Sequence, residues 1–202
     1  MTSARPAGMT NARPAGMPTV TTHPGLKEWS AAVHALLDGR QTVLLRKGGI
    51  REKRFDVSAS RFLLFPTVAH GHAERVRPEH RDLLTASRAD STADAVVLRA
   101  GAKVVAAVEV NQPDRLAEIE PLHIWTAESV RADRLDFRPK HRLTVLVVQA
   151  CPLTEPLLVP RTADYAGCRS WVQLPVTPAW GPPVHDDAAL SDVADTVRAR
   201  LG

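Results

Sequence analysis

The apolar runs of this chain are short, and few of them are separated by a regular helical pattern. Alternating and β-branched runs predict strands, and apolar repeats at helical spacing predict helices. In chain order the predicted elements are a helix at 24–37, strands at 41–46 and 61–67, a helix at 77–86, strands at 95–99 and 103–110, an interrupted helix at 116–132, strands at 142–150 and 169–176, and a final helix at 190–201. A doubly wound parallel sheet needs a helix between successive strands. The order therefore predicts an α+β domain with a bent or closed antiparallel sheet and flanking helices.

The first predicted helix depends on a stripe of apolar residues. Leu26, Trp29 and Val33 recur at helical spacing, and Leu36 continues the stripe. Pro24 suits the first turn of a helix. Trp29 is accordingly predicted to lie in the core.

Composition divides the 202-residue chain into three parts. The first 24 residues repeat the segment ARPAGM and are rich in Pro, Gly and Ala, a composition that cannot offset the entropy of ordering. We therefore expect a disordered tail at 1–24 and a single domain at 25–176. A Pro-rich linker and a helix are expected at 177–202.

Charge and hydropathy limit the partners and the location of the protein. A net charge of +4 and a pI near 9.5 favour a polyanionic partner. The apolar stretches are far shorter than the ~20 residues of a membrane span, so no membrane segment is predicted. With no secretion signal and only two cysteines, Cys151 and Cys168, we expect a cytoplasmic protein with two buried structural thiols.

A basic loop follows the second predicted element. Arg46, Lys47, Gly48 and Gly49 bring two cationic side chains next to a glycine pair, whose backbone N–H groups can approach an anion closely. This pattern suggests a phosphate or nucleic-acid contact. The alternative is a solvated turn in which the glycines provide the required backbone freedom.

Two tryptophans lie beside hydroxyl and cationic groups. Trp125 stands in HIWTAE and Trp171 in YAGCRSWV, and an aromatic ring beside polar groups is what a base-stacking pocket requires. Packing in the core is the alternative for each ring.

The two strands at 95–99 and 103–110 flank Ala-Gly-Ala and predict a hairpin. Asp94 and Glu109 on this hairpin resemble the core of PD-(D/E)XK nucleases, a resemblance that implies Mg²⁺ near a scissile phosphate. Glu28 could match the acid that many of these nucleases carry on the preceding helix. Asn111 stands where that family has its lysine.

Histidines and acids also gather at 70–80. The group comprises His70, His72, Glu74, Glu79 and His80. Because a His-x-His pair in a loop usually faces solvent, and no second cluster has ligand spacing, no metal site is predicted.

The segment Gly39 to Arg46 resembles the GxKxxExR motif of ASCH domains, which are relatives of the PUA and EVE barrels. Gln41 and Leu44 replace the lysine and the glutamate of that motif. The resemblance implies a PUA-like barrel associated with RNA.

Four separated segments, EWSAAVHALLDGRQTVLLRKGGI, RFLLFPTVAH, HIWTAE and YAGCRSWVQL, together resemble the bacterial domain-of-unknown-function family 1802. This resemblance spans residues 26–174 and implies no established activity or cofactor.

Three hypotheses follow, and whether the protein is an enzyme is left open. The first is an RNA- or nucleotide-binding domain that uses the basic loop, Trp125 and Trp171, without a cofactor. The second is a nuclease that uses Asp94, Glu109 and Asn111 with Mg²⁺. The third is a non-catalytic protein-interaction domain. The oligomeric state is not predicted.

Overall fold

One strongly bent mixed sheet organises the protein, for which a computed structural model describes residues 21–48, 54–68 and 71–202. Six strands lie in the order β2-β5-β4-β3-β1-β6. Their bounds are β1 His23–Trp29, β2 Val43–Lys47, β3 Arg61–Thr67, β4 Ala95–Glu109, β5 Leu143–Pro160 and β6 Trp171–Leu174. The predicted α+β class is confirmed. The sheet is open, and β1 and β3 are parallel while the other pairs are antiparallel.

The helices are short except for the last. Their bounds are α1 Ser30–Leu37, α2 His72–Arg75, α3 Leu83–Ser87, α4 Ala127–Val130 and α5 Asp187–Leu201, with short 3-10 or π segments named η1 Pro78–His80, η2 Arg88–Asp90, η3 Pro113–Leu122, η4 Arg131–Asp136 and η5 Ala163–Tyr165. The predicted helix at 77–86 is thus broken into separate turns. No helix of the described chain is long and apolar enough to cross a membrane.

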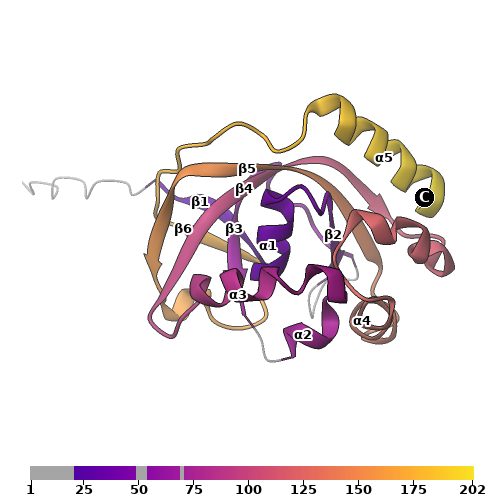
Figure 1. Ribbon diagram of the computed structural model, residues 1–202, viewed down its shortest axis with the longest axis horizontal. Helices are drawn as coiled ribbons and strands as arrows, with labels where there is room; N and C mark the ends of the chain where they lie inside the picture. The colour runs from indigo at the N-terminus through magenta and orange to yellow at the C-terminus, as the bar shows by residue number, and fades with distance from the viewer. Residues whose placement is uncertain (1–20, 49–53, 69–70) are drawn as a thin grey trace, which may run out of the picture.

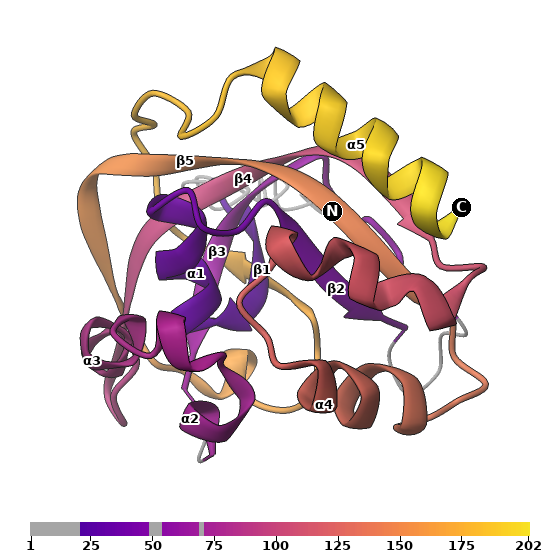
Figure 2. The same ribbon diagram turned by 45° about the vertical axis from the view of Figure 1, so that its right-hand side comes forward.

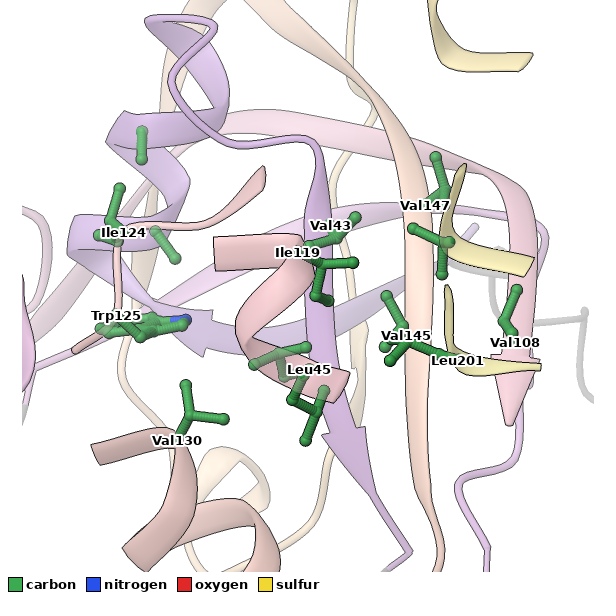
Figure 3. Close-up of a cluster of buried hydrophobic side chains, with 14 of the residues drawn as sticks. Val43, Leu45, Val108, Ile119, Ile124, Trp125, Val130, Val145, Val147 and Leu201 are labelled. Carbon is green, nitrogen blue, oxygen red and sulfur yellow. The ribbon is translucent and has the colours of Figure 1, made fainter. Parts of the chain in front are cut away.

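The long strands β4 and β5 curve over α1 (Figures 1 and 2). The concave face of the sheet, together with α1, buries one apolar cluster that includes Leu26, Val33, Leu44, Phe62 and Leu146. A second cluster lies on the other face of β2, β5 and β4 under η3, α4 and α5. In Figure 3, Trp125 lies at one side of this second cluster, whereas Val108 and Leu201 lie at the other.

The predicted helix at 24–37 is wrong in its first half, which is strand β1. Leu26 pairs with Leu64 of β3 on one side and with Trp171 of β6 on the other. Gly25 suits this crowded place, because a Cβ there would lie 2.6 Å from a side-chain carbon of Leu174. The tail predicted at 1–24 lies outside the described residues up to position 20, and residues 23–24 already belong to β1.

The predicted hairpin at 95–110 is also wrong, because β4 runs through it as one strand of 15 residues. Gly101 lies in the middle of β4, where a Cβ would be 2.0 Å from the ring of Trp180 and 2.6 Å from the carbonyl oxygen of Phe62. The glycine therefore serves close packing within a strand and not a turn.

Residues 179–184, from the predicted linker, extend the sheet along β5. The backbone N–H of Thr154 donates to the carbonyl of Ala179 at 2.9 Å, and that of Gly181 donates to the carbonyl of Pro152 at 2.8 Å. This strap covers an edge of β5 before the chain enters α5, whose Leu190 and Val197 pack into the second cluster.

Candidate functional site

A buried ion pair joins β1 to β2, which are not neighbours in the sheet. Glu28 is 4% exposed, and its carboxylate accepts a hydrogen bond of 3.0 Å from the guanidinium of Arg46. The same guanidinium donates to the carbonyl of Lys27 at 3.0 Å. Side-chain contacts, and not a ladder of strand hydrogen bonds, therefore link β1 to β2 across the bent sheet.

Backbone contacts hold the segments of Arg75 and Trp125 together beside this ion pair. Val76 and Trp125 form an isolated β-bridge, and the N–H of Thr126 donates to the carbonyl of Arg75 at 2.9 Å. The Thr126 hydroxyl accepts from the N–H of Ser129 at 3.1 Å and caps α4. The start of α4 is thereby fixed against α2.

Two tryptophans line a narrow pocket between these elements. The rings of Trp29 and Trp125 meet edge to face, with centroids 5.0 Å apart. The guanidinium of Arg75 lies 5.6 Å from the ring centre of Trp29, and its Nε donates to Asp133 at 2.8 Å. Arg134 completes the polar lining. The pocket has a volume of about 10 Å³, which is space for a single water molecule.

The charged side chains around this pocket do not balance. They comprise three guanidinium groups, of Arg46, Arg75 and Arg134, and two carboxylates, of Glu28 and Asp133. We use the name arginine–tryptophan cluster for these five residues with Trp29 and Trp125.

Arg134 carries the excess charge. Its side chain makes one long hydrogen bond, 3.5 Å to the carbonyl of Asp133, and no ion pair within the described chain. Burial lowers the pKa of Arg134, while the charge of Glu28 raises it and that of Arg46 lowers it. A guanidinium nevertheless stays protonated in proteins. In addition, Nε of Arg46 is buried and has no partner among the residues described.

Two open grooves adjoin the cluster, and residues of η4 line both of them. The cationic groove, about 340 Å³ in volume, is lined by Lys47, Val110, Pro113, Asp114, Arg131, Arg134, Leu135, Asp136, Pro139, His141, Arg142 and Leu143. The His123 groove, about 450 Å³ in volume, is lined by Pro113, Asp114, Leu116, Ala117, Glu120, His123, Ala127, Glu128, Val130, Arg131 and Leu135. Both volumes lie in the range of small-molecule sites.

The predicted basic loop is only partly available to a ligand. Lys47 caps the end of η4, where its ammonium donates to the carbonyls of Phe137 at 2.6 Å and Arg138 at 3.0 Å. Burial lowers the pKa of Lys47. Gly48 is buried with its carbonyl 3.4 Å from Nδ1 of His141, and Gly49 lies outside the described residues. Lys47, predicted to lie at the anion, therefore caps a helix end.

The two predicted stacking residues lie on different sides of Arg46. Trp125 belongs to the arginine–tryptophan cluster, whereas Trp171 stacks on Phe55 with centroids 6.0 Å apart and meets Phe62 edge to face. The guanidinium of Arg46 lies 5.1 Å from the ring centre of Phe55. Trp171 thus supports Arg46 through Phe55 and does not share a pocket with Trp125.

The residues of the nuclease hypothesis are separated. Asp94 precedes β4 and Glu109 ends it, so the single strand holds them apart by 15 residues at about 3.3 Å each. The carboxylate of Glu109 is paired with Arg142, and the N–H of Asn111 donates to the carbonyl of Leu201 at 2.8 Å. With the hairpin absent, Asp94 and Glu109 cannot share a metal ion.

The two cysteines and the predicted histidine group lie apart from these grooves or outside the described residues. Cys151 is buried as expected, whereas Cys168 is exposed and is not a core thiol. His70 lies outside the described residues. Within the described ranges, no group of three or more His, Cys, Asp or Glu side chains is placed to hold a metal ion.

Arg75, Asp133 and Arg134 were not predicted as site residues, and Trp29 was predicted only for the core. The only signal in the sequence was the high density of charge in the segment RADRLD at 131–136, which is unusual for a packed helix. Here that segment forms a π-helix, a conformation that is frequent at functional sites.

Comparisons with known proteins find one family and several similar solved structures. No curated protein matches the chain. Similar solved structures are those of an ASCH protein from Zymomonas mobilis, with a TM-score of 0.43 and 14% identity over 75% of this chain and 86% of that one, and of a mutant form of the ASCH protein from the same organism, with a TM-score of 0.40 and 15% identity over 85% and 94%. The family model described as "Domain of unknown function (DUF1802)" matches residues 25–196, and the chain therefore belongs to that family.

Proposed function

We propose that this domain binds single-stranded RNA or a nucleotide through a phosphate group held at the arginine–tryptophan cluster. The observation that carries the proposal is the unbalanced charge, three arginines against two carboxylates, at a place where the Glu28–Arg46 pair is buried and the other three groups are half-buried. A buried charge is costly unless a partner neutralises it. A phosphate supplies that partner, because guanidinium donors match its oxygens.

The surroundings favour a nucleotide over a simple anion. Proteins that bind single-stranded RNA combine cationic side chains with aromatic rings and arginine planes on which bases stack. Arg75 lies over the ring of Trp29, and Arg134 faces both the narrow pocket and the cationic groove. Because the pocket itself admits only a water, the ligand lies in the open groove and touches the cluster at Arg134.

The test is the replacement Arg134→Gln. We expect binding of a labelled single-stranded RNA to weaken by about tenfold, since a charge-assisted hydrogen bond is lost. The slope of log affinity against log salt concentration should fall by about 0.7 for one lost phosphate contact. Fluorescence anisotropy over a series of salt concentrations measures both. Arg134 is a better target than Arg46, whose loss would leave Glu28 buried without its partner.

Arg88→Gln is the matched control, because Arg88 is exposed and its change removes the same charge from a site outside the cluster. An equal loss of RNA affinity in both variants would show that the effect depends only on net charge, and it would contradict the proposed site. Absence of RNA binding by the unmodified protein at low salt would favour the protein-interaction hypothesis. Cleavage that depends on Mg²⁺ would favour a nuclease.

A further inference from the structure

The His123 groove contains one buried polar side chain that the arginine–tryptophan cluster does not use. His123 is 2% exposed and lies between η3 and α4, at the wall of the groove. Its Nδ1 accepts a hydrogen bond of 3.2 Å from the backbone N–H of Trp125. Nε2 has no hydrogen-bond partner within the described part of the chain.

The protonation of this imidazole is fixed by its surroundings. Burial lowers the pKa of His123 to about 4, and the charges of Arg77 and His80 act in the same direction. The ring is therefore neutral at pH 7. Because Nδ1 is an acceptor, the single proton is on Nε2. His123 thus offers one N–H donor at a groove whose other lining residues are six apolar ones, Leu116 and Val130 among them, and four charged ones, Asp114, Glu120, Glu128 and Arg131.

The His123 groove and the cationic groove adjoin each other and share part of their lining. Pro113, Asp114, Arg131 and Leu135 line both of them. A ligand can therefore extend from the donor of His123 to the guanidinium groups of Arg131 and Arg134. It needs a hydrogen-bond acceptor on a largely apolar body at one end and a negative charge at the other.

We propose that the His123 groove takes the base of a nucleoside monophosphate, with Nε2 of His123 donating to a ring nitrogen or carbonyl of the base and the phosphate at Arg131 and Arg134. This inference rests on the proposed function and names the part of the ligand that the arginines do not recognise. The base packs between aliphatic side chains, and Glu128 at the same wall is an acceptor for an exocyclic amino group.

The experiment compares ligands that differ only in the base. Isothermal titration of the full chain with the four 5′-mononucleotides and with ribose 5-phosphate should show at least one mononucleotide binding about tenfold more tightly than ribose 5-phosphate. His123→Asn should abolish that difference and leave ribose 5-phosphate binding unchanged. Asparagine retains an acceptor for the N–H of Trp125, and His23→Asn, at the start of β1, is the matched control.

A second variant keeps the proposal testable if His123→Asn does not fold. Ala117 is exposed at the groove, so Ala117→Trp should fill the groove and lower mononucleotide affinity at least tenfold, whereas Ala188→Trp on the exposed side of α5 should not. The Nε2 proton of His123, followed by NMR in the unmodified protein, should shift with the mononucleotide and not with inorganic phosphate.

The outcomes separate this inference from the proposed function. If RNA binding depends on Arg134 but His123→Asn and Ala117→Trp bind mononucleotides as the unmodified protein does, base recognition at His123 is wrong and phosphate binding stands. If neither RNA nor ribose 5-phosphate binds to the unmodified protein, the proposed function itself is wrong. Mononucleotide binding that is equal to ribose 5-phosphate binding in the unmodified protein would also overturn the inference.

Discussion

Asp90→Ala should lower the free energy of unfolding by about 3 to 5 kcal/mol, because it removes the centre of a buried ionic network. Asp90 is 0% exposed. One carboxylate oxygen accepts from the Ser30 hydroxyl at 3.0 Å and contacts Nε2 of His34 at 2.6 Å, and the other accepts from Nε of Arg99 at 2.7 Å. The network joins α1 to the start of β4, so its loss leaves donors from two elements without their acceptor.

Urea unfolding at pH 7 measures this effect, with Asp82→Ala as the control. Asp82 also pairs with an arginine, Arg40 at 2.8 Å, but its side chain is 57% exposed. Water replaces an exposed pair readily, so this control should unfold nearly as the unmodified protein does. A similar small effect at Asp90 would show that the network contributes little.

The Asp90 effect should also depend on pH. Burial raises the pKa of Asp90, but hydrogen bonds from His34 and Arg99 outweigh burial and hold the pKa below its usual value. A carboxylate with a lowered pKa in the folded state stabilises that state above its unfolded pKa of about 3.9, and this contribution is lost as the pH falls through the folded pKa. The difference between the unmodified protein and Asp90→Ala should therefore be constant near neutral pH and shrink in acid.

Gly101→Ala should destabilise the fold by about 3 kcal/mol, at the upper end of the range for an overpacked core. The added methyl group would meet the Trp180 ring at 2.0 Å and the carbonyl oxygen of Phe62 at 2.6 Å. The ring can move, but the carbonyl belongs to the neighbouring strand β3, so β3 and β4 would have to separate. Thermal unfolding measures the loss.

A double-mutant cycle separates the two clashes. Gly101→Ala combined with Trp180→Ala should be less destabilised than the sum of the two single changes, because the ring contact is relieved while the contact with Phe62 remains. A Gly101→Ala protein within about 0.5 kcal/mol of the original would contradict the tight packing described for β4.

Much of the fold follows from local sequence patterns. The strand at Arg61–Thr67 and the helix at Asp187–Leu201 appear where the apolar pattern predicts them, and β5 covers the predicted strand at 142–150 and continues beyond it. Each of these segments packs one apolar face, or an entire apolar run, against other apolar side chains. Their local pattern therefore agrees with their final environment.

The errors arise where distant residues decide the structure. Leu26 and Val33 both enter the concave cluster, so the spacing of a helical stripe arose from a strand followed by a helix. At Gly101 the sequence has the appearance of a turn, and the reason for the glycine is Trp180 in the C-terminal strap. No local window contains both partners.

Only part of the candidate site could be predicted from the sequence, because its residues also come from distant segments. Arg46 was identified by its basic loop, and Trp125 by its polar neighbours. Arg75 and Arg134 come from segments that only the tertiary structure brings together. Lys47 shows the converse, because a basic residue beside glycines is used to cap a helix end.

The pairing of β6 with β1 has a consequence for the synthesis of the protein. Gly25 pairs with Val172, so the first strand of the sheet waits for the sixth. Contacts so distant in sequence form slowly, because a long loop must close before they stabilise anything. While the ribosome is still at work, β1 has no partner on that side, and the growing chain presents an open strand edge to its surroundings. The sheet can therefore be completed only after β6 has left the ribosome, and until then the open edge of β1 is exposed to aggregation.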